Sequence, residues 1–219
     1  LWFGLPGAPL TLLAHIQFEL GNVAAQQGDL ERAISYYRQS FATAARIGGD
    51  EAAEQLALAY NNLAYHLHLL GDPSAVEYAR QGLALTEQKG LLGMQPFLYS
   101  TLGEIALSAG ELEEAEQYFN QGLALAERFS VQERIAGLNA NLGRLAAARG
   151  QKNRAIYRLS IALAQADSLG VHHLAAQIRI WLAPLLPPEE RHQRLVEARA
   201  FAQSSGRKRL LQEIERLEK

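Results

Sequence analysis

The sequence lacks cysteine altogether, and this absence removes several kinds of chemistry at once. Without a thiol the protein can form neither disulfides nor thiolate zinc sites, and it has no cysteine nucleophile. The lack is compatible with the cytoplasm, which is the location we expect. Long apolar runs are missing as well: they are interrupted, as between Leu67 and Leu70, far short of the roughly 18 to 20 residues that a membrane-spanning helix needs. We therefore expect no membrane span.

Motifs of catalysis are also missing. The sequence contains no Gly-x-x-x-x-Gly-Lys-Ser/Thr phosphate loop, no Gly-x-Gly-x-x-Gly turn and no Gly-x-Ser-x-Gly elbow. Histidines that bind a metal from one helix face are three or four positions apart, whereas His66 and His68 are two apart and His172 and His173 are adjacent. The sequence predicts no catalytic residue, no metal site and no cofactor, and we expect a protein that is not an enzyme.

One fragment, Gly48-Gly49-Asp50-Glu51, matches the start of the GGDEF signature of diguanylate cyclases. That signature needs a hairpin with a strand on either side, but helical periodicity surrounds this fragment and no β-rich run lies near it. We interpret the fragment as a longer loop between two helices, with Asp50 as the N-cap of the second.

Charge is unevenly distributed along the 219 residues, whose net charge is −2. Residues 1–127 hold 5 basic and 15 acidic residues, whereas residues 128–219 hold 16 basic and 8 acidic residues. An acidic and a basic end could each attract an oppositely charged partner, although scattered solvated helix faces explain the distribution equally well. The chain begins with Leu1 and shows no signal peptide, so we expect a piece of a longer protein.

Two kinds of segment alternate along the chain and repeat. One kind begins at a glycine, contains a characteristic alanine and ends fifteen residues after it: Gly28, Ala33 and Gly48; Gly71, Ala75 and Gly90; Gly110, Ala115 and Ser130; Gly150, Ala155 and Gly170. The other kind carries leucine before a small residue, at Leu20-Gly21, Leu63-Ala64, Leu102-Gly103, Leu142-Gly143 and Leu182-Ala183, with spacings of 43, 39, 40 and 40. Apolar residues recur every three or four positions in these segments, so each repeat is predicted to be a helical hairpin.

Small residues and glycines have structural purposes in such hairpins. Two antiparallel helices approach closely only where the side chains at their crossing are small. Glycines at positions 28, 71, 110 and 150 are expected to end the first helix of each hairpin, with Asp29 and Asp72 as N-caps of the second and Pro73 at a first helical position. We expect a single domain over residues 1–219, with hairpins at about 10–48, 52–90, 93–130, 132–170 and 172–205 and a capping helix at 206–218. Pro184, Pro187 and Pro188 should shorten or bend the fifth hairpin.

These residues resemble the tetratricopeptide repeat. Its Leu-Gly, Gly, Ala and aromatic positions correspond to Leu102, Gly103, Gly110, Ala115 and Phe119, and in the first copy to Leu20, Gly21, Gly28, Ala33 and Tyr37. The expected fold is all-α: a right-handed α-solenoid (superhelix) of about five hairpins plus the C-terminal capping helix. The 40-residue period resembles the repeats in sensor regions of maltose-activator-like transcription factors and related multidomain signalling ATPases of bacteria, and it is similar to those of kinesin light chain and the LGN/Pins adaptors. In those families the array binds a peptide, a protein segment or a small inducer along its concave side.

The resemblance also implies candidate binding residues. In tetratricopeptide proteins the positions one before and two after the Leu-Gly leucine usually line the concave groove, and here they hold Glu19 and Asn22, Asn62 and Tyr65, Thr101 and Glu104, Asn141 and Arg144, and Trp181 and Pro184. We take Asn22, Asn62, Tyr65, Glu104, Asn141, Arg144 and Trp181 as the candidate site. The carboxamides can donate and accept hydrogen bonds at once, and the aromatic rings offer flat apolar contact. A hydrated groove wall carries polar residues in any case, so a surface without a ligand stays an open alternative.

Two kinds of partner are not expected. Phe97 and Thr101 stand where chaperone-binding arrays carry basic residues, so no clamp for a chaperone tail is predicted. The chain ends with a basic group, Arg191, Arg194, Arg199, Arg207, Lys208 and Arg209, but glutamates lie among these residues and we predict no direct nucleic-acid contact.

The expected function is therefore binding of a protein segment, a peptide or a small effector. Our leading hypothesis is the effector- or partner-sensing domain of a larger bacterial signalling or transcriptional regulator, in contact with the neighbouring domains of that protein. The alternative is a stand-alone adaptor that scaffolds a protein complex by binding a partner peptide in its groove.

Overall fold

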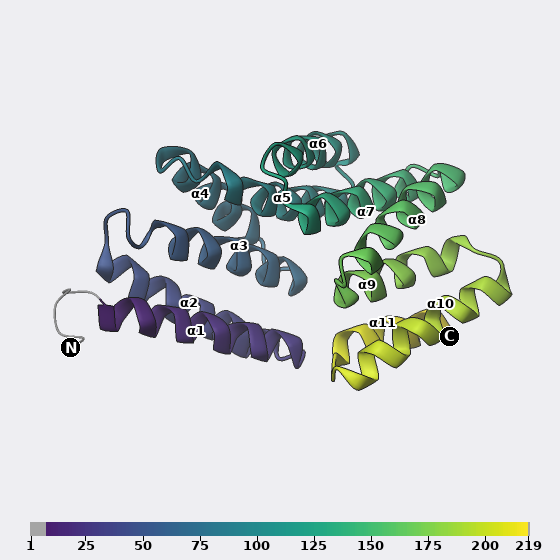
Figure 1. The fold of residues 1–219 in the computed structure, drawn as a ribbon, viewed down its shortest axis with the longest axis horizontal. Helices are drawn as coiled ribbons and strands as arrows, with labels where there is room; N and C mark the ends of the chain where they lie inside the picture. The colour runs from purple at the N-terminus through teal and green to yellow at the C-terminus, as the bar shows by residue number, and fades with distance from the viewer. Residues whose placement is uncertain (1–7, 219) are drawn as a thin grey trace. The chain divides into compact units, whose positions relative to one another are not determined.

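The computed structural model describes residues 8–218, and every regular element among them is helical (Figure 1). The α-helices in this range are α1 (Ala8–Gln26), α2 (Leu30–Ile47), α3 (Ala53–Leu69), α4 (Ala75–Gln88), α5 (Gln95–Ala109), α6 (Leu112–Arg128), α7 (Gln132–Ala148), α8 (Lys152–Ser168), α9 (His172–Leu182), α10 (Pro188–Ser204) and α11 (Lys208–Glu218). Two short 3-10 helices, η1 (Leu92–Met94) and η2 (Ala183–Leu185), precede α5 and follow α9. The expected all-α fold of five hairpins and a final helix is confirmed.

The chain divides into two compact units, and the boundary lies inside α5. Unit 1 ends at Leu102 and unit 2 starts at Gly103. In unit 1, α1 packs on α2, α2 on α3 and α3 on α4. In unit 2 the same order continues from α6 to α11, each helix packing on the one before it. The expectation of a single domain stays a prediction.

The first helices of the hairpins end at the predicted glycines 28, 71, 110 and 150, through the same pair of backbone hydrogen bonds each time. At the end of α5, Gly110 has φ 81°; its N–H donates to the Leu107 carbonyl at 3.2 Å, and the Glu111 N–H donates to the Ala106 carbonyl at 2.9 Å. This is a Schellman motif, which needs a left-handed residue after the helix. Ser130 takes that conformation after α6 with φ 55°, and among the described residues it is the one non-glycine with positive φ.

Glycines also sit where helices of one hairpin cross. A Cβ atom on Gly103 would lie 2.4 Å from the Phe119 ring, and one on Gly143 would lie 2.8 Å from Leu159. In the first hairpin Gly21 faces Tyr37 in the same way, at 2.5 Å. The predicted close approach at the Leu-Gly positions is therefore confirmed, and the large side chain of the second helix fills the space that glycine leaves.

The leucines that mark the repeat are buried in all hairpins except the first. Leu63, Leu102 and Leu182 are each 1% exposed and Leu142 is 6% exposed, whereas Leu20 is 41% exposed. The rest of that side of α1 is exposed too, at Leu12, Leu13, Ile16 and Val23. No helix among the described residues covers the side of α1 that corresponds to the stacking face of the later hairpins.

The predicted caps have mixed outcomes. Asp29 caps α2, since its Oδ1 accepts from the Arg32 N–H at 3.1 Å. Asp72 does not cap α4, which starts at Ala75 after Ser74; its Oδ1 instead accepts from the Ser74 N–H at 2.9 Å and the Ser74 hydroxyl at 2.7 Å. This repeat is one residue shorter here, and aspartate readily closes such a local turn around its own backbone.

Asp50 does not cap α3 either. That helix starts at Ala53, and the Asp50 carboxylate accepts from Lys89 Nζ at 2.7 Å. This hydrogen bond and the charge of the ammonium lower the pKa of the Asp50 carboxyl. The fragment around Gly48 and Gly49 is the loop between α2 and α3, as expected, and helices flank it on both sides.

The prolines shorten the fifth hairpin as predicted: α9 ends at Leu182, and Pro184 lies in η2 before α10 begins at Pro188. Among residues 8–218, no helix is both long and apolar enough to cross a membrane.

Candidate functional site

Polar side chains from three successive first helices form a hydrogen-bonded row in unit 1. Asn62 Nδ2 on α3 donates to Asn22 Oδ1 on α1 at 3.2 Å. Asn61 Nδ2 donates to Asn62 Oδ1 at 3.3 Å, and Thr101 Oγ1 on α5 donates to Asn61 Oδ1 at 3.0 Å. The structure thus brings the predicted Asn22 and Asn62 into direct contact, and Asn61, which was not among the predicted residues, links Asn62 to Thr101.

Aromatic side chains hold this row in place. Tyr37 is fully buried and its hydroxyl donates to Asn22 Oδ1 at 2.8 Å. Burial raises the pKa of Tyr37, so the hydroxyl stays protonated and remains a donor. The ring of His66 lies 5.1 Å from that of Tyr37, and Tyr65 meets His66 edge-on at 5.2 Å. The predicted Tyr65 therefore contacts the aromatic layer beneath the row.

In unit 2, three other predicted residues form one cluster. Glu104 on α5 accepts from Asn141 Nδ2 through Oε1 at 3.2 Å and from Arg144 Nη1 through Oε2 at 3.2 Å. The same Arg144 nitrogen donates to Asn141 Oδ1 at 3.0 Å. Asn141 is 3% exposed, and the side chains of Arg144 and Glu104 are 24% and 18% exposed. Charge and polar groups are therefore paired inside the cluster, and the Arg144 guanidinium is held in a fixed position.

Trp181 lies directly beside this cluster. The Arg144 guanidinium sits 4.4 Å from the centroid of the Trp181 ring, a distance at which a cation is attracted to an aromatic face. Trp181 also packs against the core cluster that contains Leu159 and Ile178. The predicted residues Glu104, Asn141, Arg144 and Trp181 thus form a continuous set of contacts from α5 through α7 to α9.

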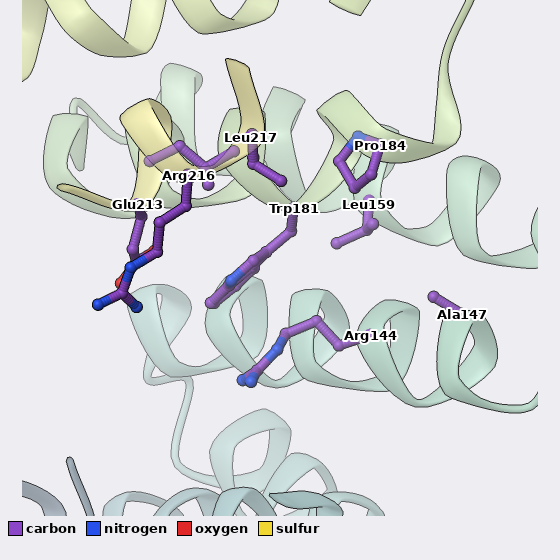
Figure 2. A pocket seen from close by; sticks show the side chains of 9 residues that line it. Arg144, Ala147, Leu159, Trp181, Pro184, Glu213, Arg216 and Leu217 are labelled. Carbon is purple, nitrogen blue, oxygen red and sulfur yellow. The ribbon is translucent and has the colours of Figure 1, made fainter. Parts of the chain in front are cut away.

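A cavity of about 330 Å³ opens beside Trp181 (Figure 2). Its walls come from α7, α8, α9, η2 and α11, all within unit 2. The predicted residues in the walls are Arg144, Trp181 and Pro184; Glu213, Arg216 and Leu217 come from α11. This volume is at the lower end of the roughly 300 to 1,000 Å³ that ligand pockets occupy, so the cavity suits one or two large side chains.

The sequence predicts α11 only as a capping helix and assigns none of its residues to the candidate site, whereas three of them line the cavity. Leu210 and Ile214 of α11 are indeed buried against α9 and α10. The sequence does contain a signal that α11 also contributes to the groove, because Trp181 follows Gly170 by eleven residues and Leu217 follows Gly206 by the same number. Leu217 therefore repeats the groove position of Trp181.

Elsewhere in the part of the chain that the structure describes, charged and metal-binding groups do not form a second site. Among residues 8–218, no three His, Asp or Glu side chains gather as metal ligands would. Several basic residues near the end of the chain are paired with glutamates: Arg194 with Glu197, Arg199 with Glu218 and Arg209 with Glu213. This pairing removes much of the positive charge that a nucleic-acid surface would require.

Stacked hairpins with small residues at their crossings and polar side chains on successive first helices define a helical-repeat protein. Sequence profiles of the tetratricopeptide repeat match residues 12–88 and residues 98–129. The chain is a tetratricopeptide repeat domain. No curated protein sequence matches it.

Solved structures with the same fold cover nearly all of the chain. BtubC (BKLC) from P. vanneervenii is 21% identical with a TM-score of 0.65, covering 96% of this chain and 84% of its own. A Rap protein complexed with Competence and Sporulation Factor is 16% identical with a TM-score of 0.76, covering 94% of this chain and 56% of its own, so this chain spans just over half of it. A putative kinesin light chain with TPR-like repeats from Podosopora anserina is 19% identical with a TM-score of 0.55, covering 95% of this chain and 96% of its own. At these identities the likeness shows the fold alone.

Proposed function

We propose that this protein is a non-catalytic module that binds a segment of a partner protein, and that the cavity beside Trp181 is where the segment anchors. The observation that carries this proposal is the cavity itself, about 330 Å³ in volume and walled by an indole ring that a guanidinium holds in place. Aromatic and arginine side chains that line a pocket commonly contribute most of the binding energy of an interface.

The asparagine row of unit 1 fits an anchoring role less well. Asn22 Oδ1 already accepts hydrogen bonds from Tyr37 and Asn62, and Asn22 Nδ2 donates to Glu19 Oε2 at 3.3 Å. A carboxamide has few further positions for a ligand once these are used. We propose that the row orders the first helices of unit 1 and touches a partner only along its surface.

The finer role we propose is the effector- or partner-sensing domain of a larger bacterial signalling or transcriptional regulator in the cytoplasm, acting through its neighbouring domains. The similarity in fold to a Rap protein complexed with Competence and Sporulation Factor supports a peptide or protein partner. A stand-alone adaptor that scaffolds a complex is the alternative. A nucleotide- or DNA-binding domain in the same gene supports the regulator; a gene that encodes repeats alone supports the adaptor.

The binding proposal is tested by selecting random phage-displayed peptides on the whole chain and measuring their affinities for variants. Trp181→Ala should weaken the binding of the selected peptides by about 2 kcal/mol or more, which is a roughly 30-fold higher dissociation constant, as expected for an interface tryptophan. Tyr157→Ala is the matched control, because Tyr157 is 68% exposed on α8 and does not line the cavity. Its binding should equal that of the wild type.

Because Trp181 also packs on the core, circular dichroism must show that the alanine variant is folded, and Trp181→Phe, which keeps part of the packing, should bind with intermediate affinity. Selected peptides that bind Trp181→Ala as tightly as the wild type would refute the proposed site.

A further inference from the structure

The cavity has an apolar interior. Leu159 and Ile180, which are 1% and 4% exposed, line it together with Leu217 and Pro184, and Figure 2 shows Leu159, Leu217 and Pro184 around Trp181. Trp181 supplies a flat wall. A group that fills this space must itself be apolar, because a polar group would lose its water without gaining hydrogen bonds there.

Three charged side chains line the same cavity, and two of them are neutralised. Arg144 is paired with Glu104 at 3.2 Å. Glu213 accepts from Arg209 Nε at 3.2 Å and from Gln177 Nε2 at 2.7 Å. The negative charge of Glu213 is therefore balanced, and the positive charge of Arg144 is balanced as well.

Arg216 is the third, and it differs from the other two. It is exposed and lies one turn along α11 from Glu213. Across residues 8–218, no carboxylate lies within ion-pair distance of its guanidinium. The cavity thus combines an apolar interior with one unbalanced positive charge at its rim.

We propose that the cavity recognises a peptide segment in which a large apolar residue lies next to a carboxylate: the apolar side chain enters the cavity, and the carboxylate pairs with Arg216. This inference rests on the proposed binding function and names the ligand chemistry of the same site. A guanidinium can donate two parallel hydrogen bonds to one carboxylate, so a single unpaired arginine is matched to a single carboxylate. The carboxylate can be the C-terminus of the peptide or the side chain of an aspartate.

The test uses four synthetic probes and the whole chain. The first is acetyl-Gly-Ser-Gly-Leu-Phe with a free C-terminal carboxylate, the second is its C-terminal amide, the third is acetyl-Gly-Ser-Asp-Leu-Phe-amide, and the fourth is the first with Phe replaced by Ala. Dissociation constants are measured by calorimetry at low and at high salt.

The apolar anchor should dominate affinity and the carboxylate should add selectivity. Removing the Phe ring should weaken binding roughly 10- to 100-fold, the effect of one buried apolar side chain. At least one carboxylate probe should bind roughly two- to fivefold more tightly than the amide, as expected for an exposed ion pair, and the difference should shrink at high salt. Whether the first or the third probe is preferred identifies the source of the carboxylate.

Arg216→Gln should abolish the preference for the carboxylate while leaving the amide bound as before. Arg154→Gln is the matched control, because Arg154 is an exposed arginine of unit 2 outside the cavity, and it should keep the preference. Equal binding of acid and amide by the wild type, a preference that survives Arg216→Gln, or no binding of either carboxylate probe would each overturn the inference. If phage-selected peptides still depend on Trp181 in those cases, the proposed function stands and only the ligand chemistry is wrong.

Discussion

Replacing Asn141 by alanine tests whether the cluster beside the cavity stabilises unit 2. The substitution removes one hydrogen bond to Glu104 at 3.2 Å and one from Arg144 at 3.0 Å, both with charged partners. Hydrogen bonds to charged groups contribute about 1.5 to 3 kcal/mol each. Glu104 and Arg144 keep their mutual bond and are partly exposed, so water replaces some of the loss. We expect unfolding free energy to fall by about 2 to 3 kcal/mol.

The matched control is Asn139→Ala on the same helix, because the Asn139 side chain makes no hydrogen bond among the described residues and gains the same helix propensity from the change. The assay is urea unfolding followed by the fluorescence of Trp181, which reports on unit 2, in a Trp2→Phe background that leaves one tryptophan. Melting temperature should fall by about 2 to 4 °C per kcal/mol in a chain of this size. A difference below about 0.5 kcal/mol between Asn141→Ala and Asn139→Ala would refute the claim that this cluster contributes to stability.

Three further predictions concern the fold. Ser130→Gly should stabilise the protein by about 0.5 to 1 kcal/mol, because serine at φ 55° is strained and glycine is not. Gly170→Ser, at φ 68°, should destabilise the protein for the same reason. A higher melting temperature for Gly170→Ser than for Ser130→Gly would contradict this prediction. Leu142→Ala should lower the unfolding free energy, measured with urea, by about 2 to 5 kcal/mol, but Leu20→Ala by only about 1 kcal/mol, because Leu142 is 6% exposed and Leu20 is 41% exposed. Equal losses would mean that this side of α1 is covered in solution. Partial desolvation and the nearby Arg207 lower the pKa of His173, although its side chain is 48% exposed and Glu133 at 3.8 Å opposes the shift. The unfolded chain therefore takes up this proton more readily, so a small part of the stability should be lost as the pH falls below about 6.5, and His173→Asn should flatten that slope of stability against pH.

The repeat made most of the fold predictable. Gly103 and Gly143 are needed because no side chain fits between the crossing helices, and Gly110 because a Schellman motif needs a left-handed residue, so these positions reveal themselves in one sequence. Caps were less predictable, since they depend on competing local contacts. Asp72 and Asp50 both had the expected residue type and spacing. The Asp72 carboxylate instead accepts a hydrogen bond from Ser74 in a local turn, and the Asp50 carboxylate accepts one from Lys89.

The sequence predicts which helix positions hold the candidate residues but not the contacts between them, and their role in binding stays a prediction. The groove positions relative to the Leu-Gly leucine predict Asn141, Arg144 and Trp181 on successive first helices. In the structure Arg144 donates a hydrogen bond to Asn141 and its guanidinium lies over the ring of Trp181. Which charges remain unpaired depends on side-chain geometry between helices, and no spacing rule reports it. Arg216 was not among the predicted residues, because its place in the cavity wall depends on how α11 packs in space.

Peptide binding beside Trp181 is tested most directly by following the indole N–H of Trp181 by NMR, in the Trp2→Phe protein, during titration with a phage-selected peptide. Because this is then the sole tryptophan, its resonance reports on the cavity wall alone. If the peptide anchors in the cavity, the indole resonance shifts and saturates at the same peptide concentration as binding measured by calorimetry. A peptide that binds in the calorimeter while the Trp181 resonance stays in place would contradict it.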